Sequence, residues 1–313
     1  MQELNYLKDK VITPGAAPFV SHATYPVEDG HADLWLYDIF PGVQLMVTDF
    51  ACETCFQDGM EQDVIGIHHC ARGRFECVFD HWNYVYMGEG DIALNSMLHP
   101  PIGASFPLKD YFGSTIILYP QTCDDVPELA GLGISAREIF RKYSLAEHCR
   151  VFRRNEAVEH VYRELYGNLA KPQLTFLRLK LLELLYHIQA DQTVFEENCG
   201  YLPKALTEKI KQAKDHMLQN EDGRISLKEL AAEHEISLTQ LKAGFKQIYG
   251  ETPYAYLRSY KMHCASQRLL ETDLQIGEIA LELGYQNPSK FAQAFRAVVG
   301  CTPAQYRSGR KNK

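Results

Sequence analysis

The feature that most constrains this sequence is a repeat in its C-terminal third, where a unit of 33 residues occurs twice. The first copy starts at Ser226 and reads SLKELAAEHEISLTQLKAGFKQIYGETPYAYLR, and the second starts at Gln275 and reads QIGEIALELGYQNPSKFAQAFRAVVGCTPAQYR. With one extra residue in the second copy, the matched pairs are Leu241 and Phe291, Phe245 and Phe295, Gly250 and Gly300, Thr252 and Thr302, Pro253 and Pro303, and Tyr256 and Tyr306. Self-similarity at a fixed period indicates a repeated structural unit, so both copies are expected to fold alike.

Each copy has the pattern of two short helices joined by a turn of three or four residues, which is typical of a helix-turn-helix. The helix boundaries carry capping signals: Ser226 with Glu229, Ser237 with Gln240, Asn287 with Pro288, Thr252 and Thr302 each before a proline, and Gly250 and Gly300 as left-handed terminators. We therefore predict an all-α tandem helix-turn-helix domain over residues 201–313.

The segment between the copies, Thr252 to about Leu270, predicts one continuous helix roughly 27 Å long at 1.5 Å per residue. Such a spacer can set two recognition helices about one DNA turn, roughly 34 Å, apart on one face of the duplex. One position breaks the repeat, because Glu235 stands in the first copy where the second has Gly284. If Glu235 adopts the left-handed conformation, it costs about 1 kcal/mol relative to glycine.

The exposed face of the second helix in each copy supplies the candidate DNA-reading residues. Gln, Asn, Ser and Thr can bond base edges, whereas Lys and Arg suit guanine or phosphate. The candidates are Thr239, Gln240, Lys242, Ala243 and Lys246 in the first copy, and Asn287, Ser289, Lys290, Gln293 and Arg296 in the second. Any one of them could instead be a solvated surface residue, so the prediction rests on the duplicated set.

The stretch GYQNPSKFAQAFRAVVGCTPAQYR resembles the hallmark of the AraC/XylS family of bacterial transcription regulators, and the likeness runs from about Leu206 to Arg307. LTQLKAGFKQIYGETPYAYLR and LRLKLLELLYHI resemble the branch typified by the pyochelin-siderophore regulator. The resemblance implies a transcription activator that binds double-stranded promoter DNA and RNA polymerase. It also implies a small-molecule effector, with a ferric siderophore as the candidate, and a homodimer.

Residues 1–125 read as a β domain, since short aromatic and β-branched runs alternate with turns such as Pro41-Gly42 and Arg72-Gly73. The sequence Gly88-Glu89-Gly90-Asp91-Ile92 resembles the turn before a strand in cupin-like sensor domains of this family. We predict a small cupin-like β-barrel or jelly roll that senses the effector.

Charge is distributed unevenly along the sequence. Residues 1–125 hold 5 Lys and Arg against 18 Asp and Glu, whereas residues 201–313 hold 17 Lys and Arg against 12 Asp and Glu. The positive charge thus lies in the predicted DNA-binding domain.

Residues 126–200 read as helical, with helices expected near 155–165 and 173–189. The second of these is apolar nearly all round, so it should be buried on two sides. The resemblance implies a dimerisation segment here, and a purely intradomain core is the alternative. The fold class is therefore α+β, with the effector domain at 1–125, the dimerisation segment at 126–200 and the DNA-binding domain at 201–313.

The effector site is less clearly marked. His68, Cys70 and Arg72 are polar candidates on the strand that resembles a cupin's first ligand strand. Cys52, Cys55, His68 and His69 offer metal-ligand chemistry, but adjacent histidines in a strand point to opposite faces, so we expect no metal. Two alternatives stay open: a metal- or redox-sensing regulator, and a metal-dependent cupin enzyme fused to a DNA-binding module.

The sequence also gives expectations for the cellular compartment of the protein and for enzymatic activity. No apolar run reaches eighteen residues and the first residues, MQELNYLKDK, lack a secretory layout, so no membrane partner is expected. Nine cysteines, an odd number without framework spacing, suit reduced thiols in the cytoplasm. We expect neither an enzymatic activity nor a cofactor.

Overall fold

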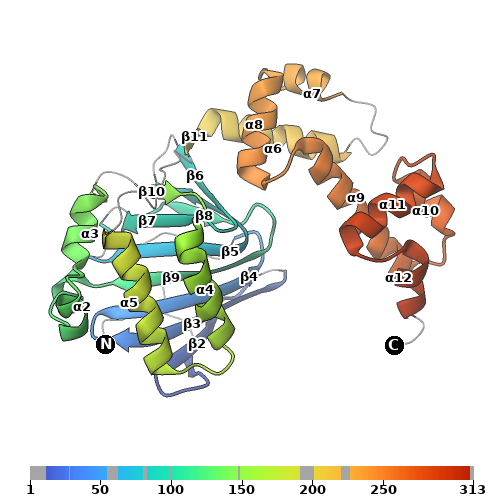
Figure 1. Cartoon of the computed structure of the whole chain (residues 1–313). Coiled ribbons are helices and arrows are strands. Elements are labelled where there is room, and N and C mark those ends of the chain that lie inside the picture. The colour runs from blue at the N-terminus through green and yellow to red at the C-terminus, as the bar shows by residue number, and fades with distance from the viewer. Residues whose placement is uncertain are drawn as a thin grey trace. The chain divides into compact units, whose positions relative to one another are not determined.

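The structure, a computed structural model, describes residues 12–27, 29–54, 63–79, 83–98, 100–146, 149–190, 201–219 and 226–310. The chain divides into two compact units, Met1–Pro203 and Lys204–Lys313. Figure 1 shows the first as a sheet with helices and the second as helices alone. Cys55, which was a candidate metal ligand, and residues 191–200 of the predicted dimerisation segment lie outside the described residues.

The first unit is built on one antiparallel sheet, which confirms the predicted β character of the N-terminal region. Its strands are β1 (Ile12–Pro14), β2 (Val20–Thr24), β3 (His31–Phe40), β4 (Val43–Ala51), β5 (Ile65–Val78), β6 (Asn83–Gly88), β7 (Ile92–Ser96), β8 (Gly103–Ser105), β9 (Tyr111–Leu118), β10 (Arg150–Phe152) and β11 (Tyr201–Pro203). The main order is β1-β2-β3-β4-β9-β5-β6-β11, with β7 and β8 also on β5 and with β10 on β7. Whether this sheet is a cupin-like barrel stays a prediction.

Strand β5 bends the sheet, because its two halves pair with different neighbours. Its first half pairs with β7 and β9, and its second half with β6 and β8. The register against β9 shifts between Cys70 and Arg72, where a bulge places an extra residue. At Gly73, which has a φ of 82°, a Cβ atom would lie 1.8 Å from the Asp110 carbonyl oxygen, so glycine is required there.

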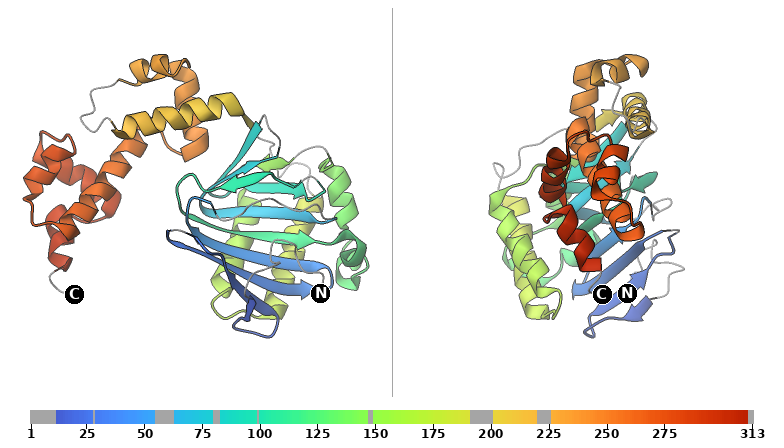
Figure 2. Two further views of the ribbon diagram at one scale, coloured as in Figure 1. Left: turned by 180° about the vertical axis from the view of Figure 1, so that it is seen from behind. Right: turned by 90° about the vertical axis from the view of Figure 1, so that its right-hand side faces the viewer.

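One face of the sheet is covered by helices. Besides α1 (Pro120–Cys123), α2 (Pro127–Gly131) and α3 (Ala136–Lys142), the unit has α4 (Glu156–Asn168) and α5 (Leu174–Ala190), which confirm the two predicted helices. Helices α4 and α5 lie side by side across this face in Figure 1, and the view from behind in Figure 2 shows the opposite face. Leu177, Leu181, Leu184, Leu185 and Ile188 of α5 are buried on the sheet side. The prediction that α5 is buried on two sides is not met by the described residues, because on its other side Leu179 is 60% and Tyr186 52% exposed.

His69 of β5 fixes α4 to the sheet. Its Nδ1 lies 2.9 Å from the Tyr166 hydroxyl and its Nε2 lies 3.3 Å from Glu159 Oε1, while its ring stacks on Tyr162 at 3.8 Å. The Tyr166 hydroxyl also bonds Ser114 of β9 at 2.8 Å. The hydrogen bond from His69 holds the pKa of Glu159 below its ordinary value. A buried histidine with both ring nitrogens paired is thus explained by packing.

The second unit is all-α, as predicted. Its helices are α6 (Lys204–Gln219), α7 (Leu227–Glu233), α8 (Leu238–Tyr249), α9 (Pro253–Glu271), α10 (Ile276–Glu282), α11 (Pro288–Val299) and α12 (Pro303–Arg310). Helix α9, the predicted spacer, contacts α8 of the first repeat and α10, α11 and α12 of the second. Among the described residues of the whole chain, none of the helices combines the length and apolarity that crossing a bilayer requires.

Candidate nucleic-acid interface and candidate ligand cavity

The two repeats have the same internal packing. Phe245 of α8 meets the Tyr256 ring edge to face at 5.4 Å and 75°, and Phe295 of α11 meets Tyr306 at 5.6 Å and 73°. Such aromatic pairs contribute about 0.5–1.5 kcal/mol beyond the apolar area they bury. Both phenylalanines are fully buried, as are Leu241 and Phe291 one turn earlier. Burial of this one face fixes which side of α8 and of α11 remains in solvent.

Helix α8 begins at a reciprocal cap that limits what Gln240 can do. The Ser237 hydroxyl accepts a hydrogen bond from the backbone N–H of Gln240 at 3.1 Å. The side-chain oxygen Oε1 of Gln240 accepts one from the backbone N–H of Ser237 at 2.9 Å. A bidentate contact with adenine needs both the oxygen and the nitrogen of a glutamine side chain. With its oxygen engaged in the cap, Gln240 can offer a base only its amide N–H groups.

Helix α11 begins at a different cap, in which Asn287 Oδ1 accepts bonds from the Ser289 amide at 2.9 Å and the Lys290 amide at 3.3 Å. Asn287 therefore has a structural role, and only its Nδ2 group could reach DNA. Gln293 is exposed one turn further along, and within the described part of the chain no hydrogen bond engages its side chain. Both ends of its amide are thus available for base readout.

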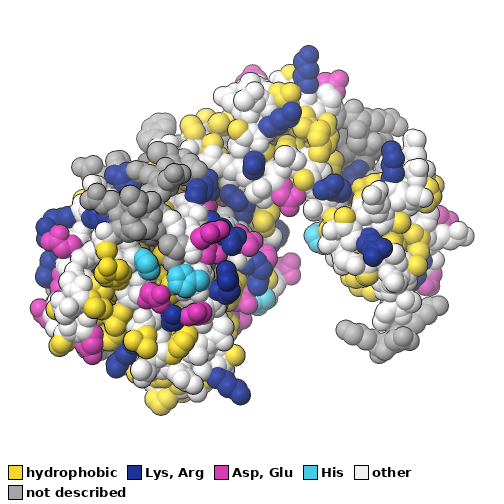
Figure 3. Space-filling model, viewed as in Figure 1, with side chains coloured by type: hydrophobic (Ala, Val, Ile, Leu, Met, Phe, Trp, Pro, Cys, Tyr) yellow, Lys and Arg dark blue, Asp and Glu magenta, His cyan; other side chains and the backbone are white. Residues whose placement is uncertain are grey.

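All ten candidate DNA-reading positions are exposed in this unit. They are Thr239, Gln240, Lys242, Ala243 and Lys246 on or beside α8, and Asn287, Ser289, Lys290, Gln293 and Arg296 on or beside α11. Figure 3 shows Lys and Arg side chains on the visible surface of this unit. The exposure meets the requirement for contact with DNA, and the contacts themselves stay predictions.

The turn of the first repeat holds a strained residue. Glu235 has a φ of 54°, in the left-handed region, and the matching Gly284 has a φ of 82°. The Glu235 side chain is paired with Lys209 of α6 at 3.1 Å, but the carboxylate is largely in solvent. Exposed ion pairs contribute about 0–1 kcal/mol, so this one offsets the backbone strain only in part.

The first unit contains a cavity of about 150 Å³ lined by residues of β4, β5, β6, β7 and β9. Its wall is mostly apolar, with side chains such as Met46, Phe50, Val64, Phe75, Cys77, Val85, Met87, Ala93, Ile117 and Cys149. The lining residues whose side chains carry nitrogen or oxygen are Thr48, His68, Asn95, Tyr111 and Thr115. This composition, an apolar wall with a few convergent polar groups, is typical of sites for small molecules.

His68 is the polar centre of the cavity. Its Nδ1 lies 3.0 Å from Thr115 Oγ1 and its Nε2 lies 2.6 Å from Asn95 Oδ1. Burial lowers the pKa of His68, opposed by the bond to Asn95, so the ring is neutral. A Cβ atom at Gly66 would lie 2.6 Å from His68 Nε2, so the glycine leaves room for the ring.

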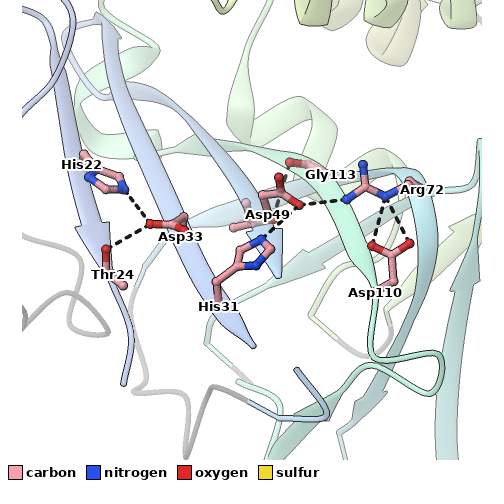
Figure 4. A network of polar contacts seen from close by, with 9 residues as sticks. His22, Thr24, His31, Asp33, Asp49, Arg72, Asp110 and Gly113 are labelled. Carbon is pink, nitrogen blue, oxygen red and sulfur yellow. Dashed lines mark hydrogen bonds and ion pairs between the residues drawn. The ribbon is translucent and has the colours of Figure 1, made fainter. Parts of the chain in front are cut away.

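The structure separates the three residues predicted to bind an effector. His68 lines the cavity. Cys70 is fully buried but does not line the cavity, and its thiol points to the carbonyl oxygens of Arg72 and Gly73. The register shift after Cys70 carries Arg72 to the surface, where it pairs with Asp49 at 2.9 Å and Asp110 at 3.0 Å. Figure 4 shows this pairing beside the contacts of His22, Thr24 and His31.

Sequence reasoning missed Thr48, Asn95 and Thr115, which lie on β4, β7 and β9. Nothing in their local sequence marks them, because only strand pairing brings these positions together. His69, adjacent to His68, points to the helices instead. Among the described residues there is also no group of three His, Cys, Asp or Glu side chains placed to hold a metal ion.

Comparison with known proteins gives a consistent result for the second unit. Residues 230–309 match a family model described as a helix-turn-helix domain. The HTH-type transcriptional regulator ExsA of Pseudomonas aeruginosa is 28% identical over 148 residues, which are 47% of this chain and 52% of that protein. The virulence regulon transcriptional activator VirF of Yersinia enterocolitica is 32% identical over 134 residues, 43% of this chain and 48% of that protein. The chain thus spans about half the length of these relatives.

Among solved structures, a transcriptional regulator from Chromobacterium violaceum, described as containing an AraC-type DNA-binding domain, is 28% identical. The match covers 33% of this chain and 92% of that one, with a TM-score of 0.31.

Replacing Glu235 by glycine should stabilise the second unit by about 0.5–1 kcal/mol, because relief of the left-handed strain exceeds the loss of an exposed ion pair. Thermal unfolding of residues 201–313 measures this change. Glu235→Ala is the control, because it removes the ion pair but keeps the Cβ atom, and it should be destabilising. A glycine variant no more stable than the wild type would show that the positive φ is not strained.

Proposed function

The second unit of this chain is an AraC-type helix-turn-helix domain, and on that basis we propose that the protein is a sequence-specific regulator of transcription. The observation that carries the proposal is the duplication of a capped helix-turn-helix whose solvent faces display Gln, Ser, Thr, Lys and Arg. In this proposal α8 and α11 enter two successive major grooves of promoter DNA. Helix α9, with 19 residues and therefore a length of roughly 28 Å, is the spacer between them.

The two reading helices have different roles in this proposal. Gln293 reads a base on α11, because both ends of its side-chain amide are available. Gln240 contributes one donor at most, because its oxygen closes the cap of α8. Lys242, Lys246 and Arg296 contact phosphate or guanine, and contacts to phosphate position a protein without specifying sequence.

We further propose that the protein activates transcription through RNA polymerase. One of the curated relatives is named as a transcriptional activator, and its aligned segment is 32% identical to this chain. The proposal extends that relative's role to this chain through the shared DNA-binding domain.

Dimerisation is proposed through α5. Leu179 and Tyr186 lie seven residues apart and therefore on one side of the helix, and both are more than half exposed in the single chain. Leu182, between them, is half-buried. An apolar stripe on a helix whose opposite side is fully buried is suited to a second copy of the same helix.

The cavity of the first unit is the proposed effector site. A cavity of about 150 Å³ admits a molecule the size of benzene. We therefore propose a compact apolar ligand with one hydrogen-bonding group, in place of a ferric siderophore. That group faces Asn95 and Thr115, because the Thr115 oxygen retains a lone pair and the Asn95 amide nitrogen retains a donor. The ligand gates DNA binding only if it binds one conformation more tightly than the other.

Gln293→Ala should lose discrimination at one base pair, worth about 1–3 kcal/mol, while retaining affinity for sequences that differ there. Sequencing of fragments selected from a randomised DNA library measures this loss. Gln267→Ala, an exposed glutamine of α9 outside both reading helices, is the control and should leave the preference unchanged. Equal weakening on every sequence would remove Gln293 from base readout.

Leu179→Glu should convert a dimer to a monomer, because it places a charge in the proposed apolar contact. Sedimentation velocity of the full chain gives the mass directly. Leu132→Glu is the matched control, since Leu132 is also about half exposed at 52% but lies outside α5. A wild-type monomer, or a Leu179→Glu variant that stays dimeric, would contradict this interface.

Phenol should bind the first unit about fivefold more tightly than benzene, because one net hydrogen bond is worth about 1 kcal/mol. Isothermal titration of the full chain compares the two ligands. Gly66→Ala crowds the polar corner at His68 and should remove the preference for phenol, and circular dichroism checks that the variant is folded. Equal affinity for the two ligands would exclude a polar anchor in the cavity.

A further inference from the structure

The last strand of the first unit is joined directly to the DNA-binding unit. Strand β11 forms an edge of the sheet and pairs with β6, with Tyr201 opposite Val85 and Leu202 opposite Tyr84. Helix α6 begins at the next residue, Lys204. We propose that β11 is a latch that couples occupancy of the cavity to the DNA-binding unit, and that Tyr201 is its positioning residue. The proposal rests on the cavity being the effector site.

The first connection to the cavity runs across the strands. Cys77 of β5 is in register with Val85 of β6, which is in register with Tyr201 of β11. Residues in register on neighbouring strands point to the same face of a sheet. Cys77 and Val85 line the cavity, and Tyr201 packs against the same hydrophobic cluster. Tyr201 therefore lies one strand beyond the wall of the cavity, on the same face of the sheet.

The second connection is a hydrogen bond. The Tyr201 hydroxyl donates to the Cys149 carbonyl oxygen at 2.8 Å, and Cys149 also lines the cavity. Cys149 immediately precedes β10, in which Val151 pairs with Ala93 of β7, another wall residue. Tyr201 thus joins two parts of the wall that are remote in sequence, and movement of either part acts on β11.

The latch is short enough to open. It has three residues, and its last, Pro203, has no backbone N–H to contribute to the ladder. Leu202 is the one buried residue of the strand. Strands this short at a sheet edge are held by few hydrogen bonds. The segments of a protein that move are generally those of lowest local stability.

Release of β11 would act on α6 directly. Helix α6 begins at Lys204, the residue that follows Pro203, so the last residue of the strand and the first residue of the helix share a peptide bond. No residue lies between the strand and the helix to absorb a change in the strand.

Thermodynamic linkage makes the coupling measurable in both directions. A ligand that packs against Val85 and Cys149 meets a different wall when Tyr201 is docked than when it is released. If the ligand favours docking by some factor, docking must favour the ligand by the same factor. Loss of the Tyr201 hydroxyl should therefore weaken ligand binding even though Tyr201 is not itself a lining residue.

The first experiment is hydrogen exchange on the full chain with Tyr201→Phe, which removes the hydroxyl that donates to the Cys149 carbonyl oxygen and keeps the aromatic ring. We expect exchange at β11 and at the paired residues of β6 to become about fivefold faster, as for the loss of one net hydrogen bond. Tyr254→Phe, the same chemical change at an exposed tyrosine of α9, should leave these segments as in the wild type. Unchanged exchange at β11 in Tyr201→Phe would overturn the latch.

The second experiment uses phenol as the probe, with exchange and promoter-DNA affinity as readouts. In the wild type, saturating phenol should slow exchange at β11 and shift DNA affinity. In Tyr201→Phe, phenol should bind more weakly, and its effect on DNA affinity should be lost. Phenol binding with equal affinity in both proteins and no change at β11 would overturn the coupling alone. No phenol binding to the wild type would overturn the effector site, and the coupling with it.

Discussion

The edge-to-face contact between a phenylalanine of each reading helix and a tyrosine of the following helix holds the DNA-binding unit together. Phe245 with Tyr256 and Phe295 with Tyr306 repeat this geometry to within 0.2 Å and 2°. Helices α8 and α11 have 12 residues each and are marginal in isolation, so each depends on packing of this kind. Because the aromatic residue fixes one side of the helix to the core, the opposite side, with its Lys, Arg and Gln residues, is necessarily presented to solvent.

A side chain that caps a helix has fewer atoms left to bond DNA bases. The two repeats differ in whether a candidate base-reading glutamine is used in this way. In the first, the cap consumes the oxygen of Gln240, a candidate base reader. In the second, the cap is supplied by Asn287, and Gln293 remains free for contact. In the proposed complex with DNA, the first repeat is therefore positioned mainly by charge and the second reads bases.

The first unit is organised by the bend in β5. Its two halves pair with different strands, its side chains alternate between the two faces up to Cys70, and the register shift between Cys70 and Arg72 changes the direction of Arg72. His68 enters the cavity, His69 fixes α4 and Arg72 reaches the surface. One strand thus contributes to the proposed effector site, to the helical layer and to an exterior ion-pair network. The same sheet ends at β11, through which the proposed coupling to the second unit passes.

The sequence by itself determined the second unit, because capping, helix periodicity and the repeat are local signals that neighbouring residues carry. The positions of helices α8 and α11, their boundaries and their exposed faces could be predicted from these signals. The left-handed conformation of Glu235 could be considered because Gly284 stands at the matching position of the second repeat. The cavity could not be predicted in this way. Thr48, Asn95 and Thr115 lie on different strands, and no local signal in the sequence marks the bulge that separates Arg72 from His68. Only strand pairing decides which of these side chains meet, since it joins residues that have no relation along the chain.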